Sequence, residues 1–236
     1  MCIEYTNYMI KAQNYKKYKH AVIAVDPVIF ALINNQLNVL LIKMKKAPYA
    51  NAWAAPGGLV KPDESLENAV RRLVSAKTGI THEAHFEQLY TFGRVNRDPF
   101  GRVVSVAYLA LIRPDSVQLK TTGEYQDIKW FPISHLPRLA YDHGEIIDVA
   151  IDRLQKRLGY TNIVRSLLPE KFSLTELQSA YESILNKKLD KRNFRKKILA
   201  LKLVKETGVK EENKAYRPAA LYEFSQDKLI IKTILS

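Results

Sequence analysis

The residues with the clearest potential for chemistry lie in one stretch, residues 57–80. It opens with the pair Gly57-Gly58 and continues into an acidic segment that contains Asp63 and Glu64. Carboxylates can bind a divalent cation, and near the start of a helix they also favour the positive end of the helix dipole. Apolar residues then recur at helical spacing, and Thr78-Gly79 is typical of a helix end. The pattern predicts a loop followed by a helix that ends at Gly79.

This loop and helix resemble the Nudix box, the signature of the Nudix hydrolase family, which reads G-x5-E-x7-R-E-U-x-E-E-x-G-U with U an aliphatic residue. Six residues match the pattern in register: Gly58, Glu64, Arg72, Val74, Gly79 and Ile80. The other three acidic positions hold Leu73, Ala76 and Lys77 instead. Steps of three and four residues separate these positions, so they share one helix face.

The resemblance implies that carboxylates on this face would bind the divalent metal that neutralises a diphosphate and activates a water. Leucine and alanine cannot bind Mg²⁺, and Lys77 would place an ammonium where the metal belongs. Glu64 and Glu67 alone cannot rebuild the cluster. We therefore predict a Nudix domain without hydrolase activity, metal or cofactor, in which Leu73 and Ala76 pack in a core. Lys77 could still act as a counter-charge for a bound diphosphate.

Composition and charge restrict the class of protein. The chain has 236 residues, 47% of them hydrophobic, and a formal net charge of +13. Such a charge favours an anionic partner. The single cysteine, Cys2, rules out an internal disulfide framework, and the five histidines show no metal-ligand spacing. No apolar run is long enough to span a membrane, and the first residues lack the order of a signal peptide, so we expect a cytoplasmic protein.

Around the Nudix-like stretch, the order of apolar segments predicts a mixed α+β fold. We expect strands at 22–25, 28–33, 37–44, 85–92, 103–112 and 128–131, and a second helix at 143–158. Strands mixed with two helices in this order suit an α/β/α sandwich of the Nudix type. We assign residues 21–159 to this domain, where an effector would bind. Residues 1–20 are expected to form a flexible basic arm.

The remaining residues, 160–236, have the order of a winged helix-turn-helix domain. Ser173-Leu174-Thr175-Glu176 is a capping box that would open a helix to about Leu185. Asp190 would cap a second helix, residues 191–202, and two strands are expected at 203–209 and 219–224. Helix, turn, helix and hairpin follow one another as in winged helix domains.

The second of these helices carries a dense positive charge. Most such charge runs are merely solvated faces, but this one occupies the position of a recognition helix. Basic side chains there would neutralise phosphates, while Arg192 and Asn193 could reach base edges in the major groove. We therefore predict DNA contacts from Thr175, Lys187, Lys188, Lys191, Arg192, Asn193, Arg195, Lys196, Lys197, Lys210, Lys214 and Arg217.

A second resemblance covers most of the chain. The segments 189–197, 217–222, 97–108 and 130–143 are similar to those of the Nudix-related transcriptional regulators, bacterial repressors that join a degenerate Nudix domain to a winged helix domain. The family implies a homodimer on a palindromic double-stranded DNA operator, released by a small effector. That effector is ADP-ribose or a related NAD metabolite in the best-known members, and a sugar such as arabinose in others.

For a nucleotide effector, the candidate contacts combine charge with aromatic surface. Arg97 and Arg102 could grip a diphosphate bidentately, and Trp53 or Phe100 could stack on a base. Alternatively, the arginines pair with acids and the aromatic rings belong to the core. The complete set of predicted ligand-binding residues is Trp53, Gly57, Gly58, Lys77, Arg97, Phe100 and Arg102.

Two other functional classes remain open from the sequence. The chain could be an active Nudix ADP-ribose pyrophosphatase whose atypical metal site uses Asp63, Glu64 and Glu67. It could also be an RNA-binding or protein-interaction module, since a basic surface alone does not distinguish duplex DNA from these partners.

Overall fold

The computed structural model describes residues 20–81, 85–113, 119–120, 122–211, 218–226, 229–231 and 234. The predicted basic arm falls outside the described residues except for His20. Two predicted DNA contacts, Lys214 and Arg217, also lie outside them. Within the described part, no helix combines the length and apolar character that crossing a bilayer requires.

A mixed sheet forms the centre of the first domain, and its order is β3-β2-β1-β6-β5, with β4 added on β1 and β7 on β2. The strand β1 pairs antiparallel with β2 through the turn Asn34-Asn35, and it runs parallel to β6. The bounds are β1 Val22–Ile33, β2 Gln36–Met44, β3 Trp53–Ala54, β4 Gly58–Leu59, β5 His85–Phe92, β6 Val103–Leu111 and β7 Tyr125–Pro132.

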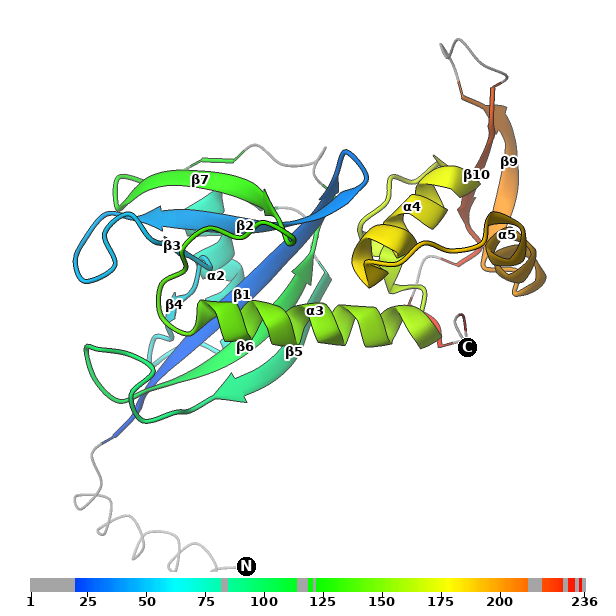
Figure 1. Cartoon of the computed structure of the whole chain (residues 1–236). Helices are drawn as coiled ribbons and strands as arrows, with labels where there is room; N and C mark the ends of the chain where they lie inside the picture. The colour runs from blue at the N-terminus through cyan, green and yellow to red at the C-terminus, as the bar shows by residue number, and fades with distance from the viewer. Residues whose placement is uncertain are drawn as a thin grey trace, which may run out of the picture.

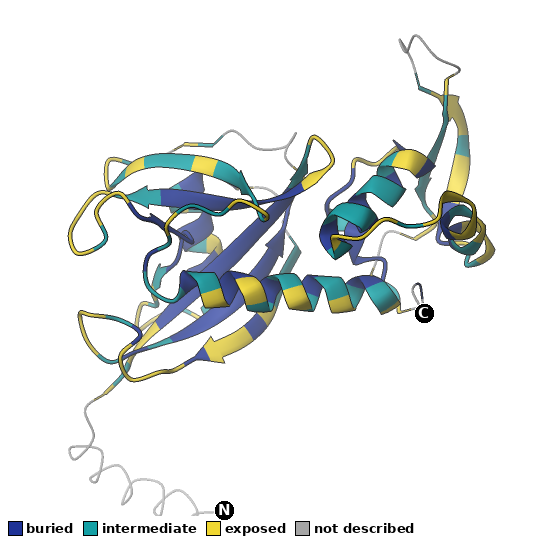
Figure 2. Cartoon of the chain, in the orientation of Figure 1, coloured by how far each residue is buried: buried dark blue, intermediate teal, exposed yellow. Residues whose placement is uncertain are grey.

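Two helices cover the opposite faces of this sheet, α2 (Leu66–Thr78) and α3 (His143–Tyr160). The alternation of side chains along β1 explains this arrangement, because successive residues point to opposite faces. Val28 and Phe30 belong to the apolar cluster that includes α3, whereas Ile29 belongs to a cluster with Val74 of α2. The predicted α/β/α sandwich is therefore confirmed, and the central strands β1, β2 and β6 are largely buried on both faces (Figure 2).

The expected interruption of β1 at Asp26-Pro27 does not occur, so the two strands predicted at 22–25 and 28–33 are one strand. Pro27 lies between the residues that pair with β4 and those that pair with β2. Asp26 is buried within the strand, where its carboxylate accepts hydrogen bonds from other side chains. A buried carboxylate is tolerated when it has such partners.

The second domain has the predicted winged helix order. A short 3-10 helix, η3 (Ile163–Ser166), is followed by β8 (Phe172–Ser173), α4 (Leu174–Leu185), α5 (Lys191–Ala200), β9 (Val204–Lys210) and β10 (Ala220–Phe224). The capping box forms as predicted: Ser173 Oγ accepts from the Glu176 amide, and the Glu176 carboxylate accepts from the Ser173 amide. The helix α5 ends two residues earlier than predicted, since Lys202 adopts a positive φ of 51°.

The two domains share one continuous apolar cluster. It extends from Val28 in the sheet, along Leu154 of α3, to Phe172 and Ile234 in the C-terminal part. The helix α3 spans the distance between the domains, from β4 at one end to the neighbourhood of α4 at the other (Figure 1). It ends at Tyr160, next to the predicted domain boundary.

Two hydrogen bonds reinforce this junction. The backbone amide of Leu37 in β2 donates to Ser183 Oγ in α4 at 2.7 Å, and the side-chain Nε2 of Gln155 in α3 donates to the Ile184 carbonyl at 2.9 Å. Leu37 is buried, and Ser183 supplies the acceptor that its amide needs.

We expect the substitution Ser183→Ala to lower the free energy of unfolding by about 1–3 kcal/mol, because it leaves the buried Leu37 amide without an acceptor. Urea unfolding followed by circular dichroism measures this loss. The matched control is Ser179→Ala on the same helix, which should change stability by less than about 0.5 kcal/mol. Equal effects of the two substitutions would show that the Ser183 bond does not hold the junction.

Candidate functional site

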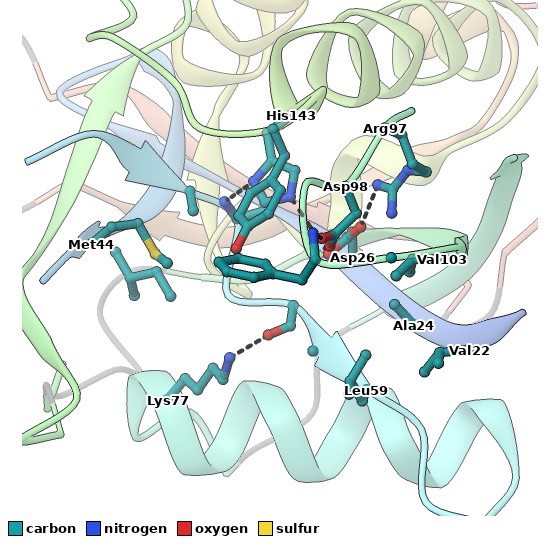
Figure 3. Close-up of a pocket in the computed structure, with 18 of the residues that line it drawn as sticks. Val22, Ala24, Asp26, Met44, Leu59, Lys77, Arg97, Asp98, Val103 and His143 are labelled. Atoms are coloured by element: carbon teal, nitrogen blue, oxygen red, sulfur yellow. Dashed lines mark hydrogen bonds and ion pairs between the residues drawn. The ribbon is translucent and has the colours of Figure 1, made fainter. Parts of the chain in front are cut away.

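A cavity of about 500 Å³ opens in the first domain at the end of the sheet where β1, β4 and β6 meet the start of α3. The predicted Nudix-box loop and the loop before β6 form its walls. In Figure 3, Lys77 extends from α2 on one side, while Arg97 and His143 lie on the other. The lining residues used below are Asp26, Gly57, Gly58, Lys77, Arg97, Phe100, Arg102, Tyr125, Tyr141 and His143.

The inner wall is organised by Asp26. Its Oδ2 accepts a hydrogen bond from Ser105 Oγ at 2.6 Å and from Arg97 Nη2 at 3.1 Å. All three side chains are buried. Because a buried carboxylate without partners would cost several kcal/mol, these contacts fix the positions of β6 and the Arg97 loop relative to β1.

Arg97 is a structural cross-link as well as a cavity residue. Its Nε and Nη2 donate to the two carboxylate oxygens of Asp142, at 2.9 and 2.7 Å, in a bidentate pair. Burial disfavours the charged guanidinium, but Asp142 and Asp26 outweigh it and raise the pKa of Arg97. The sequence left open whether Arg97 binds a ligand or pairs with acids, and the structure shows that it pairs with acids. Only its Nη1 group remains to donate a hydrogen bond to a ligand.

His143 joins the start of α3 to the loop that precedes Gly57. Its Nδ1 accepts a hydrogen bond from the Ala55 amide at 2.9 Å, so the proton of the neutral ring lies on Nε2, 3.6 Å from Asp26 Oδ1. The residue is 4% exposed. Burial lowers the pKa of His143 despite the nearby carboxylates of Asp26 and Asp142. The contacts of His143 with Ala55 and Asp26 make it a structural part of the cavity wall.

Lys77 carries the positive charge that faces the cavity from α2. Its Nζ donates a hydrogen bond to the Gly57 carbonyl and lies 5.1 Å from the centre of the Tyr125 ring. Burial lowers the pKa of Lys77, while Glu124 and Asp26 act in the opposite direction. An ammonium thus stands beside the glycine loop, on the helix face where the Nudix pattern places a carboxylate.

The glycine pair is required by close packing on this face. A Cβ on Gly57 would lie 1.9 Å from Asp26 Oδ1, and one on Gly58 would lie 2.9 Å from Leu73 Cδ2. A side chain at either position would therefore displace the cavity wall. Leu73 is buried against this loop as predicted, but Ala76 is exposed, so the expectation that both residues pack in the core is wrong for Ala76.

Glu64, the acid that matches the box in register, is used structurally. Glu64 Oε2 accepts from Arg72 Nε at 2.8 Å, and Glu64 Oε1 accepts from the Lys61 amide at 2.8 Å. The hydrogen bond from Arg72, followed by that from Lys61, lowers the pKa of Glu64 to about 2. Glu67 and Asp63 are exposed. Among the described residues, no three histidine, cysteine, aspartate or glutamate side chains are grouped to hold a metal ion.

The aromatic candidates differ in their placement. Trp53 is 9% exposed and packs edge-on against Phe131 in the core, so it does not line the cavity. Phe100 is 71% exposed and lines the cavity. Arg102 donates from Nη1 to the carbonyls of Gly93 and Arg94, which leaves Nη2 available at the lining.

Sequence reasoning missed three tyrosines of this site. Tyr125 and Tyr141 line the cavity, and Tyr49 contacts Tyr141 with 4.3 Å between ring centres. Burial, followed by the charge of Glu124, raises the pKa of Tyr125 to about 12, so its hydroxyl is a hydrogen-bond donor at neutral pH. Tyr141 adopts a positive φ of 53°. The sequence could not predict this backbone turn, because tyrosine does not favour positive φ as glycine or asparagine does.

The candidate nucleic-acid surface lies on the other domain. In α5, Phe194 and Ile198 are buried, and the opposite side of the helix is exposed (Figure 2). Arg195 Nη2 donates to Thr175 Oγ1 at 2.9 Å, so two predicted DNA contacts bond to each other, and Lys188 pairs with Glu182. The exposed basic residues of the predicted set are Lys187, Lys188, Lys191, Arg192, Lys196 and Lys210.

Comparisons with known proteins match both domains. The NUDIX domain family matches residues 24–150, and the NrtR DNA-binding winged helix domain matches residues 164–224. The chain is 35% identical over 212 residues to the ADPR responsive transcriptional repressor NtrR of Acinetobacter baylyi, covering 88% of this chain and 84% of that protein. It is also 32% identical over 146 residues to the ADP-ribose pyrophosphatase of Methanocaldococcus jannaschii, covering 61% of this chain and 82% of that one.

Crystal structures of Shewanella oneidensis NrtR are similar as well. The protein complexed with a 27mer DNA has a TM-score of 0.74 at 35% identity and covers 86% of this chain and 93% of that chain. Its NUDIX domain complexed with ADP ribose has a TM-score of 0.53 at 35% identity and covers 62% of this chain and 97% of that chain.

The buried, neutral His143 predicts a dependence of stability on pH. Its pKa is lowered in the folded state, so below the ordinary value of 6.5 the unfolded chain takes up a proton that the folded chain refuses. The contribution of His143 to the free energy of unfolding is therefore fully present above pH 6.5. It is lost as the pH falls below that value, by up to about 1.4 kcal/mol per pH unit.

We expect His143→Gln to remove this part of the pH dependence, which urea unfolding between pH 5 and pH 8 measures. The control is His135→Gln at an exposed site, which should leave the slope unchanged. If both variants keep the slope of the unsubstituted protein, His143 does not bind fewer protons when folded.

Proposed function

Because this chain belongs to the NrtR-type family of Nudix-related transcriptional regulators, we propose that it is a DNA-binding repressor controlled by ADP-ribose or a closely related nucleotide. The observation that carries the proposal is the pairing of a charged, aromatic-lined cavity in one domain with an exposed basic helix in the other. Shewanella oneidensis NrtR, which is similar to this chain, has been crystallised with a 27mer DNA, and its NUDIX domain has been crystallised with ADP ribose.

The nucleotide would bind in the cavity beside the glycine loop. Its volume of about 500 Å³ lies in the range of small-molecule sites. Lys77 and the Nη2 group of Arg102 would face the diphosphate, while Phe100 and Tyr141 offer ring surfaces for the base or the ribose. Trp53 has no role in this arrangement beyond packing, and Arg97 acts mainly by holding the wall in place.

We further propose that binding needs no divalent metal and leads to no hydrolysis. Lys77 already supplies a positive charge on the helix face where the box would bind Mg²⁺, and its ammonium cannot activate a water as a metal does. The carboxylate of Glu64 accepts a hydrogen bond from Arg72, so it is not free to bind a metal together with Asp63 and Glu67.

The relationship to the Methanocaldococcus jannaschii pyrophosphatase favours ADP-ribose hydrolysis as the second candidate function. Turnover would require a metal bound by Asp63, Glu64 and Glu67. The ion pair of Glu64 with Arg72 argues against that site, since it would have to open before Glu64 could bind a cation. A sugar effector of the arabinose type is the less favoured alternative for a regulator, because an uncharged sugar offers no negative group for Lys77 to bind.

For DNA, we propose that α5 enters the major groove, with Arg192 and Lys196 projecting from the face opposite Phe194 and Ile198. The contact between Arg195 and Thr175 would fix α5 against the start of α4. Two copies of the chain would bind a palindromic operator as a homodimer, because one helix per half-site matches the two-fold symmetry of such a sequence.

If Lys77 supplies the counter-charge, Lys77→Met should weaken ADP-ribose binding at least tenfold, about 1.4 kcal/mol or more. Isothermal titration calorimetry, performed with EDTA and then with Mg²⁺, measures the affinity, and we expect the unsubstituted protein to bind equally in both. The control Lys46→Met removes an exposed lysine that does not line the cavity. Binding that requires Mg²⁺, or release of AMP and ribose phosphate from ADP-ribose, would overturn the metal-independent sensor.

The substitutions Arg192→Ala and Lys196→Ala should together weaken binding to a cognate operator and flatten its salt dependence. Each lost phosphate contact reduces the slope of log K against log salt by about 0.9. Fluorescence anisotropy at several salt concentrations measures both effects. The control Lys156→Ala removes an exposed lysine on α3, and it should leave the slope unchanged. Equal slopes for all proteins would place the DNA on another surface.

A further inference from the structure

One leucine of α5 is exposed on the side of the helix that carries the positive charge. The segment 191–201 contains four large apolar residues, Phe194, Ile198, Leu199 and Leu201. Phe194 and Ile198 belong to the apolar core, and Leu201 packs against it. Leu199 is 43% exposed. In α5, all of whose residues the structure describes, it is the only large apolar side chain that is exposed to solvent.

Helical geometry places Leu199 in a row with two proposed DNA contacts. Residues three, four and seven positions apart share one face of a helix. Leu199 follows Lys196 by three positions and Arg192 by seven, and all three residues are exposed (Figure 2). At a rise of 1.5 Å per residue the row is about 10 Å long, which corresponds to about three base-pair steps of a duplex.

This row faces outward from the protein. The main packing partners of α5 are α4 and β9, which contact its apolar side. The helix lies in the part of the second domain that is remote from the sheet of the first domain (Figure 1). A single exposed leucine needs no explanation on an ordinary surface. On this helix, however, any partner that binds the basic side chains also covers Leu199.

The surroundings of Leu199 indicate the chemistry of that partner. An apolar side chain in a row of cations suits a surface that is anionic at its rim and has an apolar group between the anions. The major groove of B-DNA has this arrangement, because phosphates line its edges and the thymine methyl group projects into it. Its width of about 12 Å also admits an α-helix.

We propose that Leu199 contacts the methyl group of a thymine in the major groove and is a specificity-determining residue for the operator. The inference rests on the proposed binding of DNA by α5 and adds a base preference to it. Contacts from lysines to phosphates carry no sequence information, whereas the methyl group distinguishes thymine from the other three bases. Double-stranded RNA lacks this methyl group, and side chains cannot read its deep, narrow major groove.

Replacing thymine by deoxyuridine tests the contact, because it removes the methyl group and leaves base pairing unchanged. A duplex that the full chain binds is first selected from a pool of random DNA sequences. Each thymine of the selected duplex is then replaced in turn, and fluorescence anisotropy measures the affinity. For the unsubstituted protein we expect at least one replacement to weaken binding about fourfold, the effect of losing one buried methyl group.

The variant Leu199→Ala identifies the residue that makes the contact. It should bind the thymine duplex at least about fourfold more weakly than the unsubstituted protein does, and it should distinguish the thymine and deoxyuridine duplexes by less than about twofold. Because Leu199 is exposed, the variant should keep its melting temperature. The matched control is Val209→Ala in β9, which shortens another apolar residue that is 43% exposed and should retain the sensitivity to deoxyuridine.

Three results would overturn the thymine contact while operator binding stands. The first is a selected duplex in which no replacement by deoxyuridine weakens binding. The second is a Leu199→Ala variant that is as sensitive to deoxyuridine as the unsubstituted protein. The third is a change of oligomeric state in Leu199→Ala, measured by light scattering, which would assign Leu199 to a contact between copies of the chain. If no DNA duplex is selected, or if an RNA duplex binds more tightly, the proposed function itself fails.

Discussion

The arrangement of the first domain depends on one buried carboxylate, Asp26, and the three side chains around it. Ser105 and Arg97 donate to it, and His143 faces it, so one group ties β1 to β6, to the loop before β6 and to the start of α3. Removing one member of a buried charge pair typically costs about 3–5 kcal/mol, because the other charge remains buried. The Gly57 backbone also packs against Asp26, closer than any side chain would allow.

This network has a consequence for signalling, because α3 begins at the cavity and ends at the second domain. Asp142 and His143 fix its first turn to Arg97 and Ala55, while Leu154 and Leu158 pack into the apolar cluster that continues into α4. A packed helix moves as a unit, since a close-packed interior does not deform continuously. A ligand that displaces the Arg97 loop would therefore act on α3 directly, and on α4 through the hydrogen bond from the Gln155 side chain to the Ile184 carbonyl.

Local sequence patterns predicted the helices and strands well, because interactions between residues close in the sequence form them. The capping box at Ser173 and the apolar spacing of Phe194 and Ile198 are such patterns, and both appear as expected. The interior of the cavity was predicted less well, because it depends on contacts between distant segments. Nothing near Arg97 in the sequence indicates that Asp26 lies against it, 71 positions away. The role of Tyr125 likewise follows from the pairing of β7 with β2.

On the proposal that this domain binds its ligand without hydrolysis, the exchange of a carboxylate for Lys77 would let one fold serve two purposes. A metal bound by acids neutralises a diphosphate but also activates a water, so the ligand is consumed. An ammonium supplies part of the same charge and has no bound water to activate. Its place is fixed by the Gly57 carbonyl and the Tyr125 ring, so little side-chain entropy remains to be lost when a diphosphate binds. A site of this kind would favour reversible occupancy, which the proposed sensor of nucleotide concentration requires and a hydrolase does not.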